Sequence, residues 1–225
     1  MGEIITLTAS DGHQLSAYKA EPTGSPKGGV VVIQEIFGVN SHIRDVCDRY
    51  ATAGYLAVAP AVYDRVARDV ELGYGPDDIE RGRDIRAETH IDDVIKDVAA
   101  AADAAGAGGK VGIVGYCWGG TVVFVACCRL GDKLSCGSGY YGGQIIPHLH
   151  EEPRVPLMLH FGEKDAGIPL TDVDRIIAEQ PKVTVHVYLG ADHGFNCDQR
   201  TQYNPEAAVL AQDRTLAMFK EHLGG

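Results

Sequence analysis

The hydrophobic pattern at the start of the chain predicts a hairpin followed by a buried strand. Two runs with partial alternation, residues 4–10 and 14–20, flank an Asp-Gly-His turn and indicate two antiparallel strands. The continuous apolar run 30–35 is typical of a strand that is buried on both faces. Ser41 is placed to cap the helix that follows, and Gly54 is placed to close it.

The rest of the chain alternates between apolar runs and helical patterns. We expect strands at 55–60, 110–115, 135–141, 156–162 and 183–189. We expect helices at 76–106, 118–130, 172–179 and 205–222. Alternation of this kind, without a repeat or a linker, predicts a single domain (1–225). It has an α/β fold with a mostly parallel central sheet and helices on both faces.

Composition and charge limit the partners that the chain can have. Its 225 residues are 45% hydrophobic and 23% charged, which is ordinary for a soluble globular protein. The formal net charge of −11 disfavours binding to nucleic acid or to a membrane surface, because both need positive charge to meet phosphates. We therefore expect no nucleic-acid and no membrane partner. At this size we expect a monomer, and its partner to be a small molecule.

The absence of a recognisable targeting signal, together with the cysteine spacing, predicts a cytoplasmic protein. No apolar run approaches the roughly 18 residues of a membrane helix, and the first residues lack the basic start of a secretory signal. The six cysteines form no Cys-x-x-Cys pair and have no zinc-like spacing. We expect reduced thiols and no metal.

One glycine-rich stretch places a cysteine where a strand gives way to a helix. Residues 115–120 are Gly-Tyr-Cys-Trp-Gly-Gly. They match the Gly-x-nucleophile-x-Gly pattern, whose glycines let the backbone turn sharply and lift the nucleophile above the sheet. The helix N-terminus favours a thiolate, and the N–H of Trp118 is a candidate oxyanion donor. Cys117 is the candidate nucleophile, although a buried structural thiol would also fit.

Two later strand ends supply the partners that a thiol nucleophile needs. Asp165 follows the strand at 156–162, and His193 follows the strand at 183–189. The thiol needs a base, and the base needs a carboxylate that orients it. We assign His193 as the base and prefer Asp165 to Asp192 as the acid, because a sequence neighbour normally cannot reach round to the ring. The order nucleophile, acid, histidine is that of α/β-hydrolases, although a helix-capping aspartate and an ordinary loop histidine remain alternatives.

Glu35 is a further candidate for the site. It ends the apolar run 30–35, where a carboxylate is costly unless it is paired or protonated. Pairing with an arginine such as Arg44 is the structural alternative. The loop that follows is where α/β-hydrolases find their second oxyanion donor, so the N–H of Ile36 is a candidate for that role.

Four motifs together resemble the dienelactone hydrolase family. They are Gln-Glu-Ile-Phe-Gly-Val-Asn at 34–40, Gly-Tyr-Cys-Trp-Gly-Gly at 115–120, Gly-Glu-Lys-Asp-Ala-Gly-Ile-Pro at 162–169 and Ala-Asp-His-Gly-Phe at 191–195. The resemblance implies an α/β-hydrolase fold with Cys117 as nucleophile, His193 as base and Asp165 orienting it. It implies that Glu35 holds the resting thiol and helps to generate the thiolate. The implied reaction opens a dienelactone to maleylacetate through a thiol acyl-enzyme, without a metal or an organic cofactor.

The chain departs from that family at the residues that bind the substrate. Members that take dienelactone hold its carboxylate with arginines, one of them four residues after the histidine. Cys197 stands at that place here, and Arg200 follows it as the candidate replacement. A second arginine could come from Arg81, Arg83 or Arg86, of which we take Arg81 forward. Each of these arginines could also be an ordinary solvated side chain.

Aromatic residues near the motif ends could line a pocket for a flat unsaturated ring. Trp118 follows the candidate nucleophile, and Tyr140 and Tyr141 end a predicted strand. We take Tyr141 forward as a substrate-binding candidate. All three would also fit a role in the core.

Three functions are compatible with these residues. The leading hypothesis is a cysteine-dependent hydrolase of lactones, with dienelactone as the first substrate. Because the family's arginine is missing, the alternative is a broad small-ester or thioester hydrolase. From another class, a redox-sensing or binding protein could use Cys117. Such a sensor usually has a resolving cysteine close by, and Cys127 and Cys128 fall inside the helix that follows.

Overall fold

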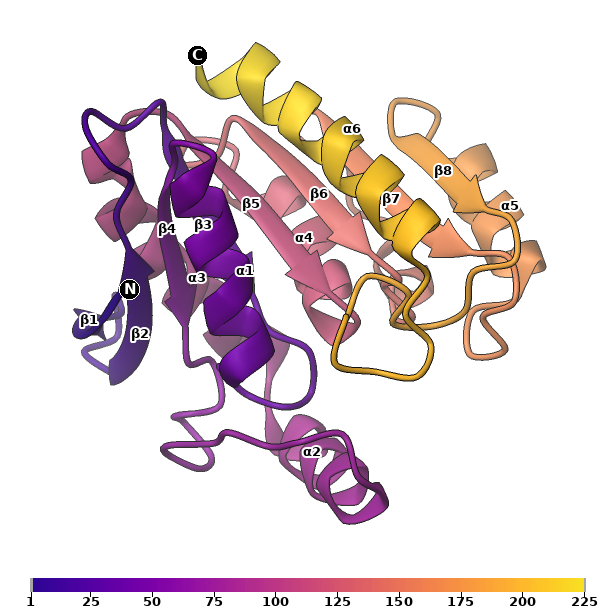
Figure 1. The fold of residues 1–225 in the computed structure, drawn as a ribbon, viewed down its shortest axis with the longest axis horizontal. Helices are drawn as coiled ribbons and strands as arrows, with labels where there is room; N and C mark the ends of the chain where they lie inside the picture. The colour runs from indigo at the N-terminus through magenta and orange to yellow at the C-terminus, as the bar shows by residue number, and fades with distance from the viewer. Residues whose placement is uncertain (1, 225) are drawn as a thin grey trace.

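The computed structural model describes residues 2–224. Its centre is an eight-stranded β-sheet (Figure 1). The strands are β1 (Glu3–Thr8), β2 (Gln14–Ala20), β3 (Gly29–Ile33), β4 (Leu56–Pro60), β5 (Val111–Tyr116), β6 (Cys136–Tyr140), β7 (Leu157–Gly162) and β8 (Thr184–Tyr188). Their order across the sheet is β1-β2-β4-β3-β5-β6-β7-β8. The pairs β1–β2 and β2–β4 are antiparallel, and every other pair is parallel.

Helices cover both faces of this sheet. They are α1 (Ser41–Thr52), α2 (Pro76–Glu88), α3 (Ile91–Ala105), α4 (Trp118–Arg129), α5 (Leu170–Glu179) and α6 (Pro205–Leu223). In Figure 1, α1 and α6 lie in front of the sheet, α3 and α4 lie behind it, and α2 projects below it. Among the described residues, no helix is both long enough and apolar enough to cross a membrane.

The burial of each strand follows from its place in the sheet. Every residue of β3, β4, β5 and β6 is buried, because helices cover both faces of these central strands. The edge strands β1 and β8 are partly exposed. This arrangement confirms the predicted α/β fold with a mostly parallel central sheet and helices on both faces.

Some predicted boundaries were wrong. The expected helix 76–106 is two helices, because Thr89 and His90 have extended backbone between α2 and α3. The cap of α1 is Asn40 and not Ser41, since the Asn40 side chain accepts a hydrogen bond from the N–H of Ile43 at 3.2 Å. Strand β3 ends at Ile33, which leaves Glu35 in the loop beyond it.

Two glycines allow α4 to begin directly against the ends of neighbouring strands. A Cβ at Gly119 would lie 2.5 Å from the carbonyl oxygen of Gln34, and a Cβ at Gly120 would lie 2.5 Å from that of Tyr140. Real Cβ atoms do not approach backbone this closely, so larger residues would force the helix away. The first turn of α4 is therefore held between the ends of β3 and β6.

We expect Gly119→Ala to lower the free energy of unfolding by about 1–3 kcal/mol, because the added methyl group overpacks this contact. Urea unfolding followed by circular dichroism measures the change. Gly143→Ala is the matched control, since a Cβ there would meet Ile168 at an ordinary 3.4 Å. Equal stabilities of the two variants would show that the contact at Gly119 does not constrain the helix.

Candidate active site

Cys117 lies at a strained turn between β5 and α4. Its φ of 55° and ψ of −120° are a positive-φ conformation that non-glycine residues rarely adopt. Its N–H donates to the carbonyl oxygen of Tyr140 at 3.0 Å, which ties the turn to the end of β6. The structure thus has the strand, turn and helix that the glycine-rich motif predicts, and it leaves the thiol half-buried.

The structure brings the three predicted residues Cys117, His193 and Asp165 together, and we call them the triad. The Nε2 atom of His193 lies 3.2 Å from Sγ of Cys117, and its Nδ1 atom lies 2.7 Å from Oδ2 of Asp165. Asp165 is buried, and its other oxygen accepts a hydrogen bond from the N–H of Gly167 at 2.9 Å. Asp192 instead accepts from the backbone N–H of His193, so the ring is oriented by Asp165.

The surroundings of His193 favour its charged form. Burial by itself lowers the pKa of His193, but the hydrogen bonds with Asp165 and Cys117 outweigh it and raise the pKa to about 10. The imidazole therefore carries a proton near neutral pH in this arrangement. A positive charge beside Sγ is what stabilises a thiolate.

Glu35 lies just beyond β3 and is 1% exposed. Its Oε1 accepts from Nη1 of Arg200 at 3.2 Å, and its Oε2 accepts from the Tyr74 hydroxyl at 3.3 Å. Arg44, the alternative partner, instead pairs with Glu71 at 2.7 Å. The family resemblance implies that Glu35 holds the resting thiol, but in this structure Arg200 and Tyr74 hold the carboxylate. Tyr74 lies in a segment without regular pattern, so nothing in the sequence marked it.

Among the candidate arginines of α2, the structure places Arg86, and not Arg81, beside Trp118 and Cys117. Arg81 is exposed on α2. The guanidinium of Arg86 lies 4.8 Å above the ring of Trp118 and donates to Oε1 of Gln144 at 2.6 Å. The buried residues Gly82 and Ile85 mark the inward face of α2, but Arg81 and Arg86 flank this face symmetrically at helical spacing, so the sequence alone does not separate them.

Among residues 2–224, the acceptors for Arg86 are uncharged, namely Gln144 and the carbonyl oxygen of Thr89, and its buried Nε makes no hydrogen bond. Burial lowers the pKa of Arg86, while the nearby Tyr63 and Cys117 side chains act in the opposite direction. A guanidinium remains charged even so. An unpaired cation close to the candidate nucleophile is suited to hold an anionic group.

The aromatic candidates divide between the site and the core. The ring of Tyr141 lies 5.1 Å from that of His193, and Tyr141 has a positive φ of 39°. Its buried hydroxyl has no hydrogen-bond partner within the described residues. Tyr140 instead bonds Thr215 at 2.7 Å inside the core. Trp118 stacks on Tyr63 at 5.5 Å and is buried beneath Arg86.

The two candidate oxyanion donors lie in the two segments that meet at Gly119, namely the start of α4 and the loop after β3. Trp118 is the first residue of α4, so its N–H lies before the helix's own ladder of hydrogen bonds. Ile36 lies just past the end of β3, and α4 is held against that end by Gly119. Their N–H groups remain the predicted pair.

Comparison with known proteins shows the family of this chain. The family model described as "Dienelactone hydrolase family" matches residues 15–223. A Synechocystis protein named "Putative carboxymethylenebutenolidase" is 38% identical over 230 residues, covering 93% of each chain. Carboxymethylenebutenolidase of Pseudomonas putida is 32% identical over 227 residues, covering 95% of this chain and 94% of that protein. The chain belongs to the dienelactone hydrolase family.

A solved structure supports the same conclusion. The crystal structure described as "Putative Dienelactone Hydrolase" from Klebsiella pneumoniae superposes with a TM-score of 0.84 and 30% sequence identity, covering 98% of this chain and 100% of that one. This member of the dienelactone hydrolase family has the α/β-hydrolase fold and is a hydrolase that acts on ester or lactone bonds.

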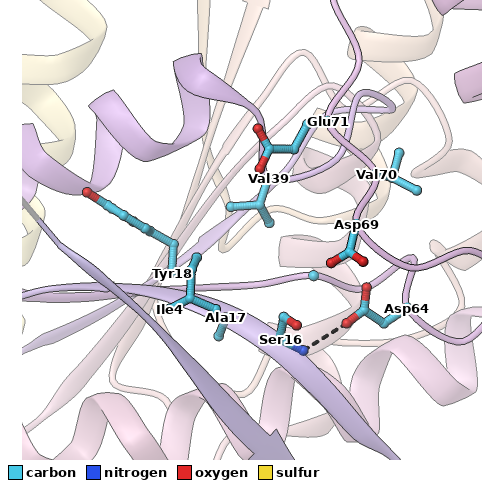
Figure 2. Close-up of a pocket in the computed structure, with 10 residues that line it drawn as sticks. Ile4, Ser16, Ala17, Tyr18, Val39, Asp64, Asp69, Val70 and Glu71 are labelled. Atoms are coloured by element: carbon cyan, nitrogen blue, oxygen red, sulfur yellow. Dashed lines mark hydrogen bonds between the residues drawn. The ribbon is translucent and has the colours of Figure 1, made fainter.

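A separate cavity of about 120 Å³ lies between the N-terminal hairpin and the loop after β4 (Figure 2). Its acidic lining is partly engaged, because Asp64 accepts from the N–H of Ser16 at 2.8 Å and Glu71 pairs with Arg44. None of its lining residues belongs to the triad. The acidic side chains of this cavity would repel an anionic ligand.

For this dienelactone hydrolase family member, we expect Asp165→Asn to lower the pKa of His193 and to lower stability in a pH-dependent way. A raised folded-state pKa stabilises the protein fully below about pH 6.5, and this contribution is lost as the pH rises through about 10. The variant should therefore lose more of its free energy of unfolding at pH 6 than at pH 10. The expected loss is on the order of 1–3 kcal/mol, the contribution of a charged hydrogen bond.

Urea unfolding at the two pH values measures this difference, and imidazole chemical shifts report the pKa of His193. Asp192→Asn is the control, because Asp192 contacts only the backbone of His193. A loss in Asp165→Asn that is the same at both pH values would contradict the electrostatic coupling.

Proposed function

We propose that this protein hydrolyses lactones through a thiol acyl-enzyme formed on Cys117. The single observation that carries the proposal is the continuous contact from Sγ of Cys117 through His193 to Asp165, at 3.2 Å and 2.7 Å. Such a chain of contacts is the arrangement in which a base activates a nucleophile and a carboxylate orients the base.

The first half of the proposed reaction opens the lactone. His193 holds the proton that the thiol has given up, and Sγ of Cys117 attacks the carbonyl carbon as a thiolate. The N–H groups of Trp118 and Ile36 stabilise the oxyanion that forms. Collapse of this intermediate breaks the ring C–O bond, and the leaving oxygen takes the proton from His193. The open-chain product remains attached to Cys117 as a thioester.

The second half releases the product. His193 removes a proton from a water molecule, which attacks the thioester carbonyl. The sulfur of Cys117 leaves as a thiolate, and His193 keeps the proton taken from water, which restores the starting pair. Asp165 stays ionised throughout and stabilises the imidazolium that forms in each half. No electrons are transferred, and the residues at the site supply each proton step.

We propose that the substrate is a lactone bearing a carboxylate, with dienelactone, which opens to maleylacetate, as the leading candidate. The unpaired guanidinium of Arg86 supports an anionic substrate, because it lies above Trp118 and close to Cys117. The apolar faces of Trp118 and Tyr141 suit a flat unsaturated ring. A substrate carboxylate could also compete with Glu35 for Arg200, since the two are held by a single contact at 3.2 Å.

A neutral small-ester or thioester hydrolase is the second candidate. The observation that favours it is the pairing of Arg200 with Glu35, which leaves Arg200 already neutralised. Cys197, where the family places an arginine, adds no charge. The two candidates share the chemistry at the triad and differ only in the group that anchors the substrate.

The function is tested by following the loss of dienelactone ultraviolet absorbance beside the hydrolysis of a neutral activated ester. Turnover of dienelactone supports the first candidate, and ester turnover without dienelactone loss supports the second. Absence of both would overturn the hydrolase chemistry proposed for this site.

We expect Cys117→Ala to lower turnover of either substrate by at least about a thousandfold, because no acyl-enzyme can form without the thiol. Steady-state kinetics measures the loss, and mass spectrometry of the quenched enzyme detects the acyl adduct of the unmodified protein. Cys128→Ala is the control, since Cys128 lies buried within α4. Turnover by Cys117→Ala close to that of the unmodified protein would exclude this nucleophile.

We expect Arg86→Gln to raise KM for dienelactone by about 10- to 100-fold, the effect of losing a charged hydrogen bond of about 1.5–3 kcal/mol. KM for the neutral ester should stay nearly unchanged, because that substrate carries no carboxylate. Arg81→Gln is the matched control on the exposed face of α2. Equal effects of Arg86→Gln on both substrates would rule out Arg86 as the anchor.

A further inference from the structure

We propose that Glu35, His42 and Cys197 form a binding site for a transition-metal ion such as Zn²⁺, beside the triad and separate from it. Metal bound there would replace Arg200 as the cationic partner of Glu35. None of the three donors belongs to the triad, so the site does not depend on Cys117 being the nucleophile.

Three distant segments bring these donors together. Glu35 follows β3, His42 is in the first turn of α1, and Cys197 lies in the loop between β8 and α6. All three are buried, with at most 1% of each residue exposed. One ligand atom of each lies within 4.8 Å of the ligand atoms of the other two.

His42 provides a second and independent indication of a ligand. It is fully buried, yet neither of its ring nitrogens makes a hydrogen bond to any residue between 2 and 224. Buried polar groups in native structures are nearly always paired, because an unpaired one costs roughly 1–3 kcal/mol.

Asp198 is placed to orient the imidazole toward such a ligand. Oδ1 of Asp198 lies 3.5 Å from Nδ1 of His42, and its carboxylate is also held by Arg49. Histidines that bind metals usually face a carboxylate with their other nitrogen. With Nδ1 turned toward Asp198, Nε2 is the nitrogen left for the metal.

The donor set selects the class of metal. A thiolate, an imidazole and a carboxylate together suit Zn²⁺ and similar transition metals, whereas Mg²⁺ and Ca²⁺ prefer oxygen ligands alone. Tetrahedral bonds of about 2.0–2.3 Å would place the donors about 3.3–3.8 Å apart. The observed arrangement therefore needs to close by about 1 Å, and a water molecule can take the fourth position.

Charge also balances at this site. Binding of Zn²⁺ to the Cys197 thiol forms a metal–sulfur bond and releases the thiol proton to solvent, without a change of oxidation state. The thiolate and the Glu35 carboxylate together carry two negative charges, which neutralise the ion. Arg200 then loses its attraction to Glu35, and its guanidinium becomes free to face the triad.

The test uses Co²⁺ alone as the probe in full-length protein carrying Cys117→Ser, so that the triad thiol cannot contribute. We expect one equivalent of Co²⁺ to give a thiolate-to-cobalt charge-transfer band in the near ultraviolet and intense tetrahedral bands in the visible. Addition of Zn²⁺ should remove these bands by competition. Absence of a charge-transfer band at millimolar Co²⁺ would overturn the proposal.

Two further substitutions in the Cys117→Ser background locate the site. Cys197→Ser should abolish the charge-transfer band, and His42→Asn should weaken Co²⁺ binding at least tenfold while the thiol remains. Cys128→Ser is the matched control, because it removes another buried thiol and should leave the spectrum unchanged. Circular dichroism establishes which variants fold, and His42→Asn decides the question if Cys197→Ser does not. Unchanged Co²⁺ affinity in folded His42→Asn would refute the site.

Discussion

The close approach of α4 to the ends of β3 and β6 is the constraint on which the site depends. Only glycine can occupy 119 and 120, because a Cβ at either position would meet backbone oxygen at 2.5 Å. Cys117 takes up the resulting sharp turn with a positive φ of 55°. The buried strands on both sides stabilise this strained conformation. The turn places the thiol where residues of the loops after β7 and β8 can contact it.

Two sets of charges meet around that thiol. On one side, Asp165 and Cys117 keep His193 protonated and outweigh the cost of its burial. On the other side, Glu35 is neutralised by Arg200 beyond the end of β3. The buried carboxylates of Asp165 and Glu35 each have a partner of opposite sign, as a low-dielectric interior requires. Changing one partner therefore changes the electrostatics of the whole site.

Fewer structural contacts fix the residues proposed to bind the substrate than fix the triad. Arg86 lies against Trp118 from α2, the helix that projects below the sheet in Figure 1. The loop after β8 carries both Arg200 and Cys197, at which the sequence is expected to differ from the pattern of the family. The scaffold can thus keep one reaction while these two peripheral segments alter which acyl group is accepted.

The sequence by itself determined the sheet, its covering helices and the positions of Cys117, Asp165 and His193. These follow from local rules, because hydrophobic periodicity marks each strand and glycines mark the turns at strand ends. The tertiary structure alone decided which arginine meets which group: Arg200 and Glu35 are 165 positions apart in the chain. The local sequence around a long charged side chain does not predict its partner, because the partner is set by the packing of segments that are distant in the chain.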